Sequence, residues 1–434
     1  MSATMAQDAA QIARDAGLNP IDYLRSRGYV YDVTEEVELR AAFDRGVISA
    51  YVGFDPTAPS LHVGHLLGIM MLASLQRFGH RPIALGGGGT ALVGDPSGKT
   101  STRALLTEEE IRSNLRSILP QFDRYLDFAG GRFGENPAAL LMNNADWLLQ
   151  LRYIEFLRDI GRHFSVNEML AAETYKLRLE GSGLNFVEFN YRIVQAYDFL
   201  HLYRTTGCTL QMGGSDQWGN IVAGIDLIRR AEGARAFGLV CPLLTTASGQ
   251  KMGKTEGNSV WLDPRLTTPY DYYQYWINVD DTDVEKLLKL YTFLPDDQIA
   301  ELTRGEGAAL REAKRVLAFE STKLTHGEEA AVTAEETTKA LFGRDGGASA
   351  DSLEAAVPTV EVAAAELDDR FTIAEAFVRA GLCTSRGEAR RLATQGGLTI
   401  DDERIEDVDR PFRTNGGAAM LRVGKKRYMR LVVR

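Results

Sequence analysis

An alternation of strand, helix and strand near residue 50 limits the fold of this chain more than any other feature of its sequence. Residues 48–53 are mostly apolar, residues 62–78 place apolar side chains at helical spacing, and residues 81–85 form a second apolar run before four glycines. Strand, helix and strand within roughly 35 residues make the unit of a parallel sheet. We therefore predict an α/β fold with a Rossmann-like, doubly wound parallel sheet over residues 1–240. Such domains bind ligands at the carboxyl ends of their strands.

The other elements of this domain follow from the same periodicities. We predict strands at 138–143 and 209–212, a helix at 147–160, and helices over most of the first 50 residues.

The rest of the chain divides by composition into four segments. Residues 241–268 contain a Gly-rich loop with two lysines, and residues 269–345 have a mostly helical pattern. Residues 346–370 are rich in Gly, Ala and acidic side chains, which is typical of a linker. Residues 371–434 hold 13 Lys and Arg against 8 Asp and Glu, although the whole chain has a net charge of −10. We therefore predict a small, basic C-terminal domain that binds an anionic partner.

Composition excludes several classes of protein. No apolar run reaches the length of a membrane span, so we predict no membrane association. The 3 cysteines are widely spaced, and the 6 histidines form no recognisable ligand pattern. These counts argue against a disulfide framework and a zinc site, so we predict a cytoplasmic protein without a metal site of its own.

The stretch G-D-P-S-G-K-T at residues 94–100 ends like a phosphate-binding loop. That motif needs Gly, four residues, and then Gly-Lys-Ser or Gly-Lys-Thr. Val93 stands where the first glycine is required, so the spacing argues against a P-loop.

The stretch P-S-L-H-V-G-H places His62 and His65 at the start of a predicted helix, with Gly64 between them. A helix N-terminus carries partial positive charge and free N–H donors. Glycine allows close approach of a ligand, and imidazole N–H groups can donate to phosphate oxygens as negative charge develops there. The alternatives are half of a metal site or a chance pair on the surface.

A loop at residues 251–255 reads K-M-G-K-T, and alone it would be interpreted as a solvated loop. Together, H-V-G-H and K-M-G-K-T resemble the two signatures of class I aminoacyl-tRNA synthetases. The chain is most similar to the bacterial tyrosyl-tRNA synthetases within that class. The resemblance covers nearly the whole chain, through Y-V-G-F-D-P-T-A-P-S-L-H-V-G-H, G-D-P-S-G-K, residues 191–198, G-G-S-D-Q-W-G-N and the basic C-terminal domain.

The resemblance implies a pocket for L-tyrosine. Its members are Tyr51 and Asp198 at the phenolic hydroxyl, Asp95, Tyr191 and Gln195 at the ammonium group, and Gln217 near the carboxylate. Tyr191, Gln195 and Asp198 are spaced as one face of a helix. Phenylalanine lacks the hydroxyl and would leave buried polar groups unpaired, which explains how such a pocket rejects it.

The resemblance also implies an ATP site. Its members are Gly53, Asp55, Thr57, His62, His65, Gly214, Asp216, Lys251 and Lys254. The expected catalytic groups are His62, His65, Lys251, Lys254 and Thr255. The consensus of the lysine loop is K-M-S-K-S, so Gly253 and Thr255 depart from it, and Thr255 keeps a hydroxyl. ATP is expected as a substrate, accompanied by Mg²⁺, and no protein nucleophile is required.

The C-terminal domain resembles a small RNA-binding domain shared with a ribosomal small-subunit protein, through S-R-G-E-A-R-R-L and Gly396-Gly397-Leu398. Arg386, Arg390 and Arg391 are expected to share a helical face and to contact phosphates. The implied partner is tRNA(Tyr), and the implied assembly is a homodimer.

The sequence leaves three other interpretations of the function open. A tryptophanyl-tRNA synthetase has the same fold, but Tyr51, Asp198 and the basic domain argue against it. A small-molecule nucleotidylyltransferase can also carry H-x-G-H, but it would not explain the helical segment or the RNA-binding domain. A non-catalytic RNA-binding protein of this fold would not need both histidines and both lysines.

Overall fold

The computed structural model describes residues 8–97, 106–171, 173–181, 183–245, 252, 254–255, 258–342, 359–368, 370–401, 403–414, 417–424 and 427–434. The chain divides into two compact units. The first consists of Met1–Thr267 and Gln274–Gly327, and the second of Thr268–Tyr273 and Glu328–Arg434.

The first unit is built on a six-stranded sheet with the order β1-β6-β5-β2-β3-β4. The strands are β1 (Asp32–Val33), β2 (Ser49–Phe54), β3 (Arg81–Gly86), β4 (Leu140–Asn143), β5 (Cys208–Gly214) and β6 (Phe237–Cys241). All neighbours are parallel except β1 and β6. The strand order reverses between β2 and β5, which pair at Tyr51 and Gln211. Ligands of doubly wound sheets bind at such a reversal, beyond the carboxyl ends of the strands.

The helices of this sheet domain are α1 (Ala9–Asp15), α2 (Pro20–Ser26), α3 (Glu36–Arg45), α4 (Val63–Arg77), α5 (Thr90–Val93), α6 (Glu108–Ile118), α7 (Ala145–Leu148), α8 (Tyr153–Asp159), α9 (Val166–Leu170), α10 (Glu173–Glu180), α11 (Phe186–Thr206) and α12 (Trp218–Glu232). The helical region that follows contains α13 (Pro269–Ile277), α14 (Val284–Tyr291), α15 (Asp296–Thr303), α16 (Ala308–His326) and α17 (Glu328–Phe342).

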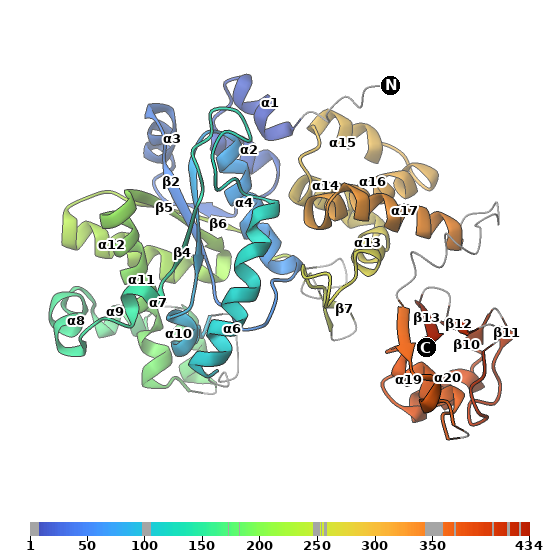
Figure 1. Cartoon of the computed structure of the whole chain (residues 1–434). Helices are drawn as coiled ribbons and strands as arrows, with labels where there is room; N and C mark the ends of the chain where they lie inside the picture. The colour runs from blue at the N-terminus through green and yellow to red at the C-terminus, as the bar shows by residue number, and fades with distance from the viewer. Residues whose placement is uncertain are drawn as a thin grey trace. The chain divides into compact units, whose positions relative to one another are not determined.

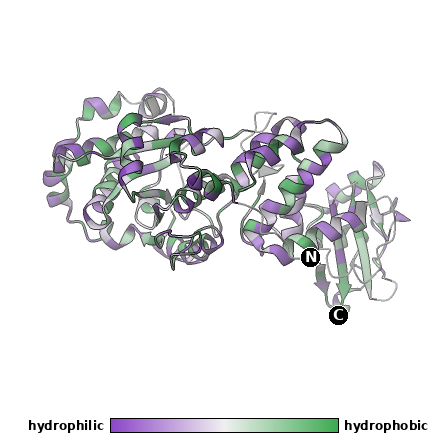
Figure 2. Ribbon diagram, turned by 90° about the horizontal axis from the view of Figure 1, so that it is seen from above, coloured by the Kyte–Doolittle hydropathy of each residue, from purple (hydrophilic) through white to green (hydrophobic). Residues whose placement is uncertain are grey.

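Helices cover both faces of the six-stranded sheet. Helix α4 packs against β2 and β3 and buries nearly all of its side chains, whereas α11 and α12 pack against each other and against β5. Figure 1 shows α4 on one side of the strands and α11 with α12 on the other. Most helices carry both hydrophobic and hydrophilic residues in Figure 2, as expected for helices that cover a core with one face. The predicted doubly wound fold is confirmed.

The second unit contains a five-stranded sheet with the order β11-β10-β12-β13-β9. Its strands are β9 (Thr359–Val362), β10 (Leu398–Ile400), β11 (Glu403–Arg404), β12 (Ala418–Val423) and β13 (Arg427–Val433), and its small helices are α19 (Ile373–Arg379) and α20 (Arg386–Thr394). Phe377, Phe412 and Leu421 lie at the centre of its apolar core. A mixed α+β domain with its own core is therefore present at this end of the chain.

Two predictions of local structure are wrong. The helix expected at 147–160 is two separate helices, α7 and α8, because Arg152 has extended backbone angles and interrupts the helical path. Residues 359–362, expected within the linker, form β9 and pair in parallel with β13. Strands β1 and β6 were not predicted, and β6 crosses the boundary expected at residue 240.

Candidate active site

Two histidines begin helix α4, immediately after the loop that leaves β2. The Nδ1 atom of His62 accepts a hydrogen bond from the N–H of Gly64 at 3.0 Å and caps the helix. The Nδ1 atom of His65 accepts from the N–H of His62 at 3.1 Å. The two imidazole rings stack with their centroids 3.9 Å apart. The predicted position of both histidines at a helix start is confirmed.

These hydrogen bonds determine which ring nitrogen carries the proton. Because each Nδ1 accepts, the proton of each neutral ring lies on Nε2. Packing around the ring, and to a lesser degree the neighbouring His62, lowers the pKa of His65 to about 3. His65 is therefore neutral near pH 7. The arrangement supplies Nε2–H donors at the N-terminus of a 15-residue helix, which is a suitable site for phosphate oxygens.

The chain that follows the lysine loop returns to this helix start. The N–H of Val63 donates to the carbonyl of Val260 at 3.0 Å, and the N–H of Leu262 donates to the carbonyl of Leu61 at 2.8 Å. His62 and Trp261 thereby form an isolated antiparallel bridge. The two signatures are distant in sequence, and this pairing brings their neighbourhoods together.

The lysine loop itself is described only in part. Lys254–Thr255 form strand β7, which pairs with β8 (Asn258–Ser259). Lys251 and the side chains of Lys254 and Thr255 lie outside the described residues. Their expected roles stay predictions.

Replacement of Gly64 by alanine should displace His62 without harming the fold. An added Cβ would lie 2.8 Å from Cε1 and 2.9 Å from Nδ1 of His62, so the ring must move. Alanine also favours a helix by roughly 0.5–1 kcal/mol over glycine. We expect the rate of the adenylate formation implied by the resemblance to fall about 10- to 100-fold, because a small misplacement of a reacting geometry has that effect. Tyrosine affinity should not decrease, and the melting temperature should change little, because the helix propensity of alanine offsets the lost cap of His62.

Gly387→Ala is the matched control, because Gly387 occupies the same position relative to the cap of helix α20. The nearest atom to its added Cβ is Oγ of Ser385, at an ordinary 3.8 Å. Pyrophosphate exchange and calorimetric tyrosine binding measure the two effects. Full exchange activity in Gly64→Ala would contradict the role assigned to the position of His62.

Asp55 lies where β2 ends and joins two parts of the site. Its Oδ1 accepts from the hydroxyl of Thr90 at 2.7 Å, and its Oδ2 accepts from the hydroxyl of Tyr191 at 3.0 Å. The hydroxyl of Tyr191 uses its hydrogen in the bond to Asp55, so its oxygen can accept a hydrogen bond from an ammonium group. A Cβ on Gly87 would lie 2.0 Å from Oδ1 of Asp55, which is why glycine is needed there. The structure thus brings the expected nucleotide residue Asp55 against the expected tyrosine residue Tyr191.

Asn220 organises the remaining residues predicted for the ammonium and carboxylate groups. Its Nδ2 lies within hydrogen-bond distance of Oε1 of Gln195 at 3.2 Å and of Oε1 of Gln217 at 3.1 Å. The Nε2 of Gln217 donates to Oδ2 of Asp95 at 2.7 Å, and the N–H of Ser97 donates to Oδ1 of Asp95 at 2.9 Å. The structure therefore places Asp95, Gln195 and Gln217 in one connected network.

Tyr51 and Asp198 form the most buried part of the site. Tyr51 is 1% exposed and Asp198 is 2% exposed. The oxygens of Asp198 accept from Nδ2 of Asn144 and from Nε1 of Trp147, both at 2.8 Å. The hydroxyl of Tyr51 has no hydrogen-bond partner among the described residues. A buried hydroxyl without a partner next to a buried carboxylate can bind a ligand hydroxyl.

Burial controls the charge of Asp198. Loss of hydration raises its pKa to about 7, although Asn144 and Trp147 act in the opposite direction by donating to the charged form. Burial, and then the charge of Asp198, raise the pKa of Tyr51 far above its ordinary value. Tyr51 is therefore a neutral phenol, while Asp198 titrates within the physiological range.

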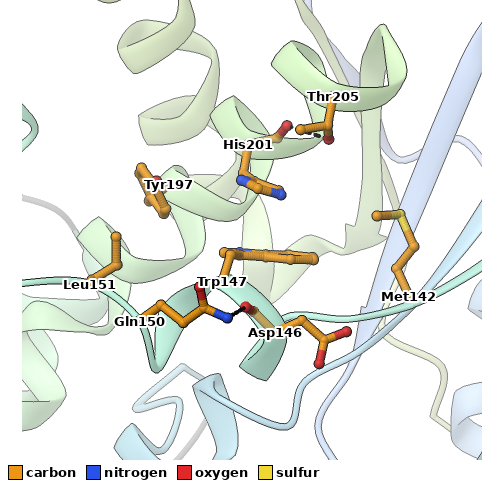
Figure 3. A pocket seen from close by; sticks show the side chains of 8 residues that line it. All are labelled: Met142, Asp146, Trp147, Gln150, Leu151, Tyr197, His201 and Thr205. Atoms are coloured by element: carbon orange, nitrogen blue, oxygen red, sulfur yellow. Dashed lines mark hydrogen bonds between the residues drawn. The ribbon is translucent and has the colours of Figure 1, made fainter.

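Trp147 separates Asp198 from a surface pocket of about 600 Å³. His201 stacks on the indole of Trp147 with a centroid distance of 4.3 Å. Figure 3 shows the His201 ring lying over Trp147, with Tyr197 beside them. The stack fixes the plane of the indole, and so directs its N–H toward Asp198.

The other residues predicted for ATP lie around the same strand ends. Gly53 and Thr57 are exposed near the end of β2. Gly214 ends β5, and a Cβ there would lie 2.6 Å from Oδ1 of Asp216. Gly53 and Gly214 therefore lie at the carboxyl ends of the neighbouring strands β2 and β5, and Thr57 lies in the loop between β2 and α4.

The predicted arginines of the C-terminal domain all lie in α20, and their side chains are exposed. Arg386 forms an ion pair with Glu375, and Arg390 forms a bidentate pair with Asp409, in which its Nη2 lies 2.7 Å from Oδ1. To bind phosphates, Arg386 and Arg390 would have to release these acidic partners. The phosphates of the RNA must therefore compete with Glu375 and Asp409.

Sequence reasoning missed Asn144, Trp147 and Asn220 as members of the site. Asn144 directly follows β4, and a polar residue at the carboxyl end of a predicted strand was the one available signal. Within the described part of the chain, no three His, Cys, Asp or Glu side chains come together as metal ligands. Among the same residues, no helix is both long and apolar enough to cross a membrane.

Comparisons with known proteins find relatives along nearly the whole chain. A family model described as tRNA synthetases class I (W and Y) matches residues 44–343, and one for a tyrosine–tRNA ligase SYY-like C-terminal domain matches residues 350–431. The tyrosine–tRNA ligase of Caldanaerobacter subterraneus subsp. tengcongensis is 50% identical over 96% of this chain and 100% of its own length. That of Desulfosudis oleivorans is 50% identical over 96% and 99%. A C-terminally truncated mitochondrial tyrosyl-tRNA synthetase of Aspergillus nidulans has a TM-score of 0.68 at 31% identity, covering 77% of this chain and 97% of that one.

Proposed function

The chain belongs to the tyrosine–tRNA ligases of the class I aminoacyl-tRNA synthetases, and from this premise we propose roles for the residues around β2, α4 and α11. Members of this family join L-tyrosine to tRNA with ATP as a substrate. The single observation that supports our assignment best is the buried pair of Tyr51 and Asp198, which offers an acceptor and a hydroxyl to one ligand hydroxyl. We propose that this pair binds the phenolic hydroxyl of tyrosine.

The reaction has two steps. A carboxylate oxygen of tyrosine attacks the α-phosphorus of ATP, the bond to the bridging oxygen breaks, and pyrophosphate leaves. A ribose hydroxyl at the 3′ end of tRNA(Tyr) then attacks the carbonyl carbon of the adenylate, and AMP leaves. Catalysis of this kind consists of positioning and charge stabilisation. We propose that His62 and His65 donate Nε2–H to the phosphates, assisted by Lys251, Lys254 and Thr255.

The remaining polar residues would hold the rest of the substrates. We propose that Asp95, Tyr191 and Gln195 accept from the ammonium group and that Gln217 lies near the carboxylate. Gly53, Asp55, Thr57, Gly214 and Asp216 would then line the nucleotide side. We propose that Mg²⁺ accompanies the phosphates of ATP.

Amino-acid-dependent ATP–pyrophosphate exchange without tRNA tests the assignment. Tyrosine, tryptophan and phenylalanine should be compared in parallel. We expect exchange with tyrosine alone. Exchange with tryptophan would refute the proposed hydroxyl site, because tryptophan has no phenolic hydroxyl to pair with Tyr51 and Asp198.

Tyrosine recognition should depend on pH near 7. Below its pKa of about 7, Asp198 gains a proton, which must compete with the donors Asn144 and Trp147 for its oxygens. The acceptor for the substrate hydroxyl is therefore lost as the pH falls. We expect tyrosine affinity to decrease up to roughly tenfold per pH unit below 7, the limit for one proton. Phenylalanine affinity should stay flat, and a flat curve for tyrosine between pH 6 and 8 would contradict the proposal.

We also propose a homodimer in the cytoplasm. Large apolar side chains are exposed on α8, α9 and the start of α11, among them Ile154 at 72% and Phe186 at 67%. A monomer rarely exposes so much apolar surface on neighbouring elements. Ile154→Glu should shift the chain to a monomer in sedimentation equilibrium. An unchanged mass would exclude this surface as the interface.

For the C-terminal domain we propose contacts to tRNA(Tyr) through Arg386, Arg390 and Arg391. The ion pairs of Arg386 and Arg390 are exposed, and exposed pairs contribute little stability, so phosphates can replace their acidic partners. Arg391→Ala should weaken tRNA binding in filter-binding assays and reduce the salt dependence.

A further inference from the structure

A buried guanidinium lies beside the proposed substrate site, and its Nε atom has no hydrogen-bond acceptor among the described residues. Arg192 follows Tyr191 in helix α11 and is only 7% exposed. Among the described residues, nothing accepts a hydrogen bond from its Nε atom. Its Cζ lies 4.6 Å from the centre of the Tyr175 ring, which supplies a cation–π contact but no acceptor. Burial lowers the pKa of Arg192, and the negative charge of Asp95 opposes this shift. Because nothing among the described residues accepts from Nε, this atom can donate to a further oxyanion.

The guanidinium points at the start of a long helix. A Cβ added to Gly219 would lie 2.7 Å from Nη2 of Arg192, so the glycine makes room for the guanidinium in the first turn of α12. Helix α12 has 15 residues, and no side chain caps its N-terminus. A helix N-terminus and a guanidinium are both positive, so their approach is unfavourable unless an anion lies between them. The guanidinium and the partial positive charge of the helix start together attract an oxyanion.

The position of Asp95 identifies which oxyanion fits. Asp95 is the proposed acceptor for the ammonium group, and it is held by Gln217, the residue that precedes α12. The start of α12 therefore contacts both residues: Gln217 donates to Asp95, and Gly219 lies against the guanidinium of Arg192. The ammonium and carboxylate of an amino acid share one carbon atom, so a ligand bound at Asp95 presents its carboxylate within this turn. We infer that Arg192 binds the α-carboxylate of tyrosine and orients it for attack on ATP.

This inference rests on the proposed ammonium site, and calorimetry with two ligands can test both. Tyrosinol keeps the phenol and the ammonium group but lacks the carboxylate. We expect Arg192→Met to weaken tyrosine binding at least roughly tenfold, the effect of losing a charge-assisted hydrogen bond, and to leave tyrosinol unchanged. Arg192→Lys should recover part of the loss, because it keeps the charge without the planar fork. Arg204→Met, an exposed position on the same helix, is the control and should affect neither ligand.

The melting temperature is a second measurement, and a binding role and a purely structural role of Arg192 predict opposite changes in it. A buried cation whose Nε has no acceptor adds a desolvation cost to the unliganded protein, so Arg192→Met should melt at the same or a higher temperature. Equal losses for tyrosine and tyrosinol, or a lower melting temperature, would show that Arg192 serves packing. Unchanged tyrosine binding with a raised KM for ATP would assign the guanidinium to a phosphate and overturn the inference. Failure of tyrosinol to bind the wild-type chain would remove the ammonium site and this inference with it.

Discussion

Replacement of Asp198 by asparagine is expected to lower kcat/KM for tyrosine activation by about 10- to 150-fold, the value of a hydrogen bond to a charged group. Asparagine removes the charge and turns one acceptor into an NH₂ donor. That donor would face Nδ2 of Asn144 or Nε1 of Trp147, which now donate to the carboxylate at 2.8 Å. The activation of phenylalanine should change little or improve, because it makes no use of the carboxylate. The ratio of kcat/KM for tyrosine to that for phenylalanine should therefore fall by a similar factor.

Pyrophosphate exchange with both amino acids measures this ratio. Asp226→Asn is a suitable control, since Asp226 is a partly exposed residue of the neighbouring helix α12 that pairs with Arg229. Tyr51→Phe removes the other half of the hydroxyl site. It should weaken tyrosine binding without lowering stability, because the Tyr51 hydroxyl has no partner among the described residues. If discrimination survived in Asp198→Asn, the phenolic hydroxyl would have to be recognised elsewhere.

Some of the residues predicted for the site lie close together in the sequence, on one helix or at one helix start, and these could be placed from the sequence alone. Tyr191, Gln195 and Asp198 were expected on one helical face, and they lie on α11. His62 and His65 were expected at a helix start, and they begin α4. In each case a local periodicity positions the polar groups, so no knowledge of distant contacts is needed.

The residues that were missed depend on contacts between distant elements. Asn144 reaches from the end of β4 to Asp198 and to Thr90, whose hydroxyl lies 2.9 Å from its Nδ2. Asn220 likewise connects α12 with α11 and with the loop at Ser97. An asparagine near a strand end or a helix start is usually part of a turn or a cap, so its sequence neighbours do not reveal such a bond.

The wrong helix at 147–160 has a different cause. The stretch was predicted as one helix from its apolar periodicity, yet Leu149, Tyr153 and Ile154 are exposed. Apolar periodicity indicates burial somewhere, and it cannot separate a core from a surface that is buried only in an assembly. The same residues that misled the secondary-structure prediction therefore support the proposed dimer surface.

Replacement of Arg27 by methionine is expected to destabilise the first unit by about 3–5 kcal/mol, the range for breaking a buried charged network. The side chain is 0% exposed and ends in a set of backbone carbonyls after helix α14. Its Nε donates to the carbonyl of Lys289 at 2.7 Å, and its Nη2 donates to that of Thr292 at 2.7 Å. Its Nη1 donates to the carbonyl of Leu294 and to Oδ1 of Asp296, both at 2.8 Å. Methionine would leave these carbonyls buried without donors.

Urea denaturation followed by tryptophan fluorescence can measure the change selectively. All 4 tryptophans belong to the first unit, so their emission reports its unfolding. Arg25→Met is the matched control. Arg25 lies on the same turn of the chain, but its side chain is 46% exposed and pairs with Glu36 at 2.7 Å. Exposed pairs contribute about 0–1 kcal/mol, so the control should barely move the midpoint. Similar midpoints for the two variants would mean that Arg27 does not hold α14 to the sheet domain, and that apolar packing carries this junction.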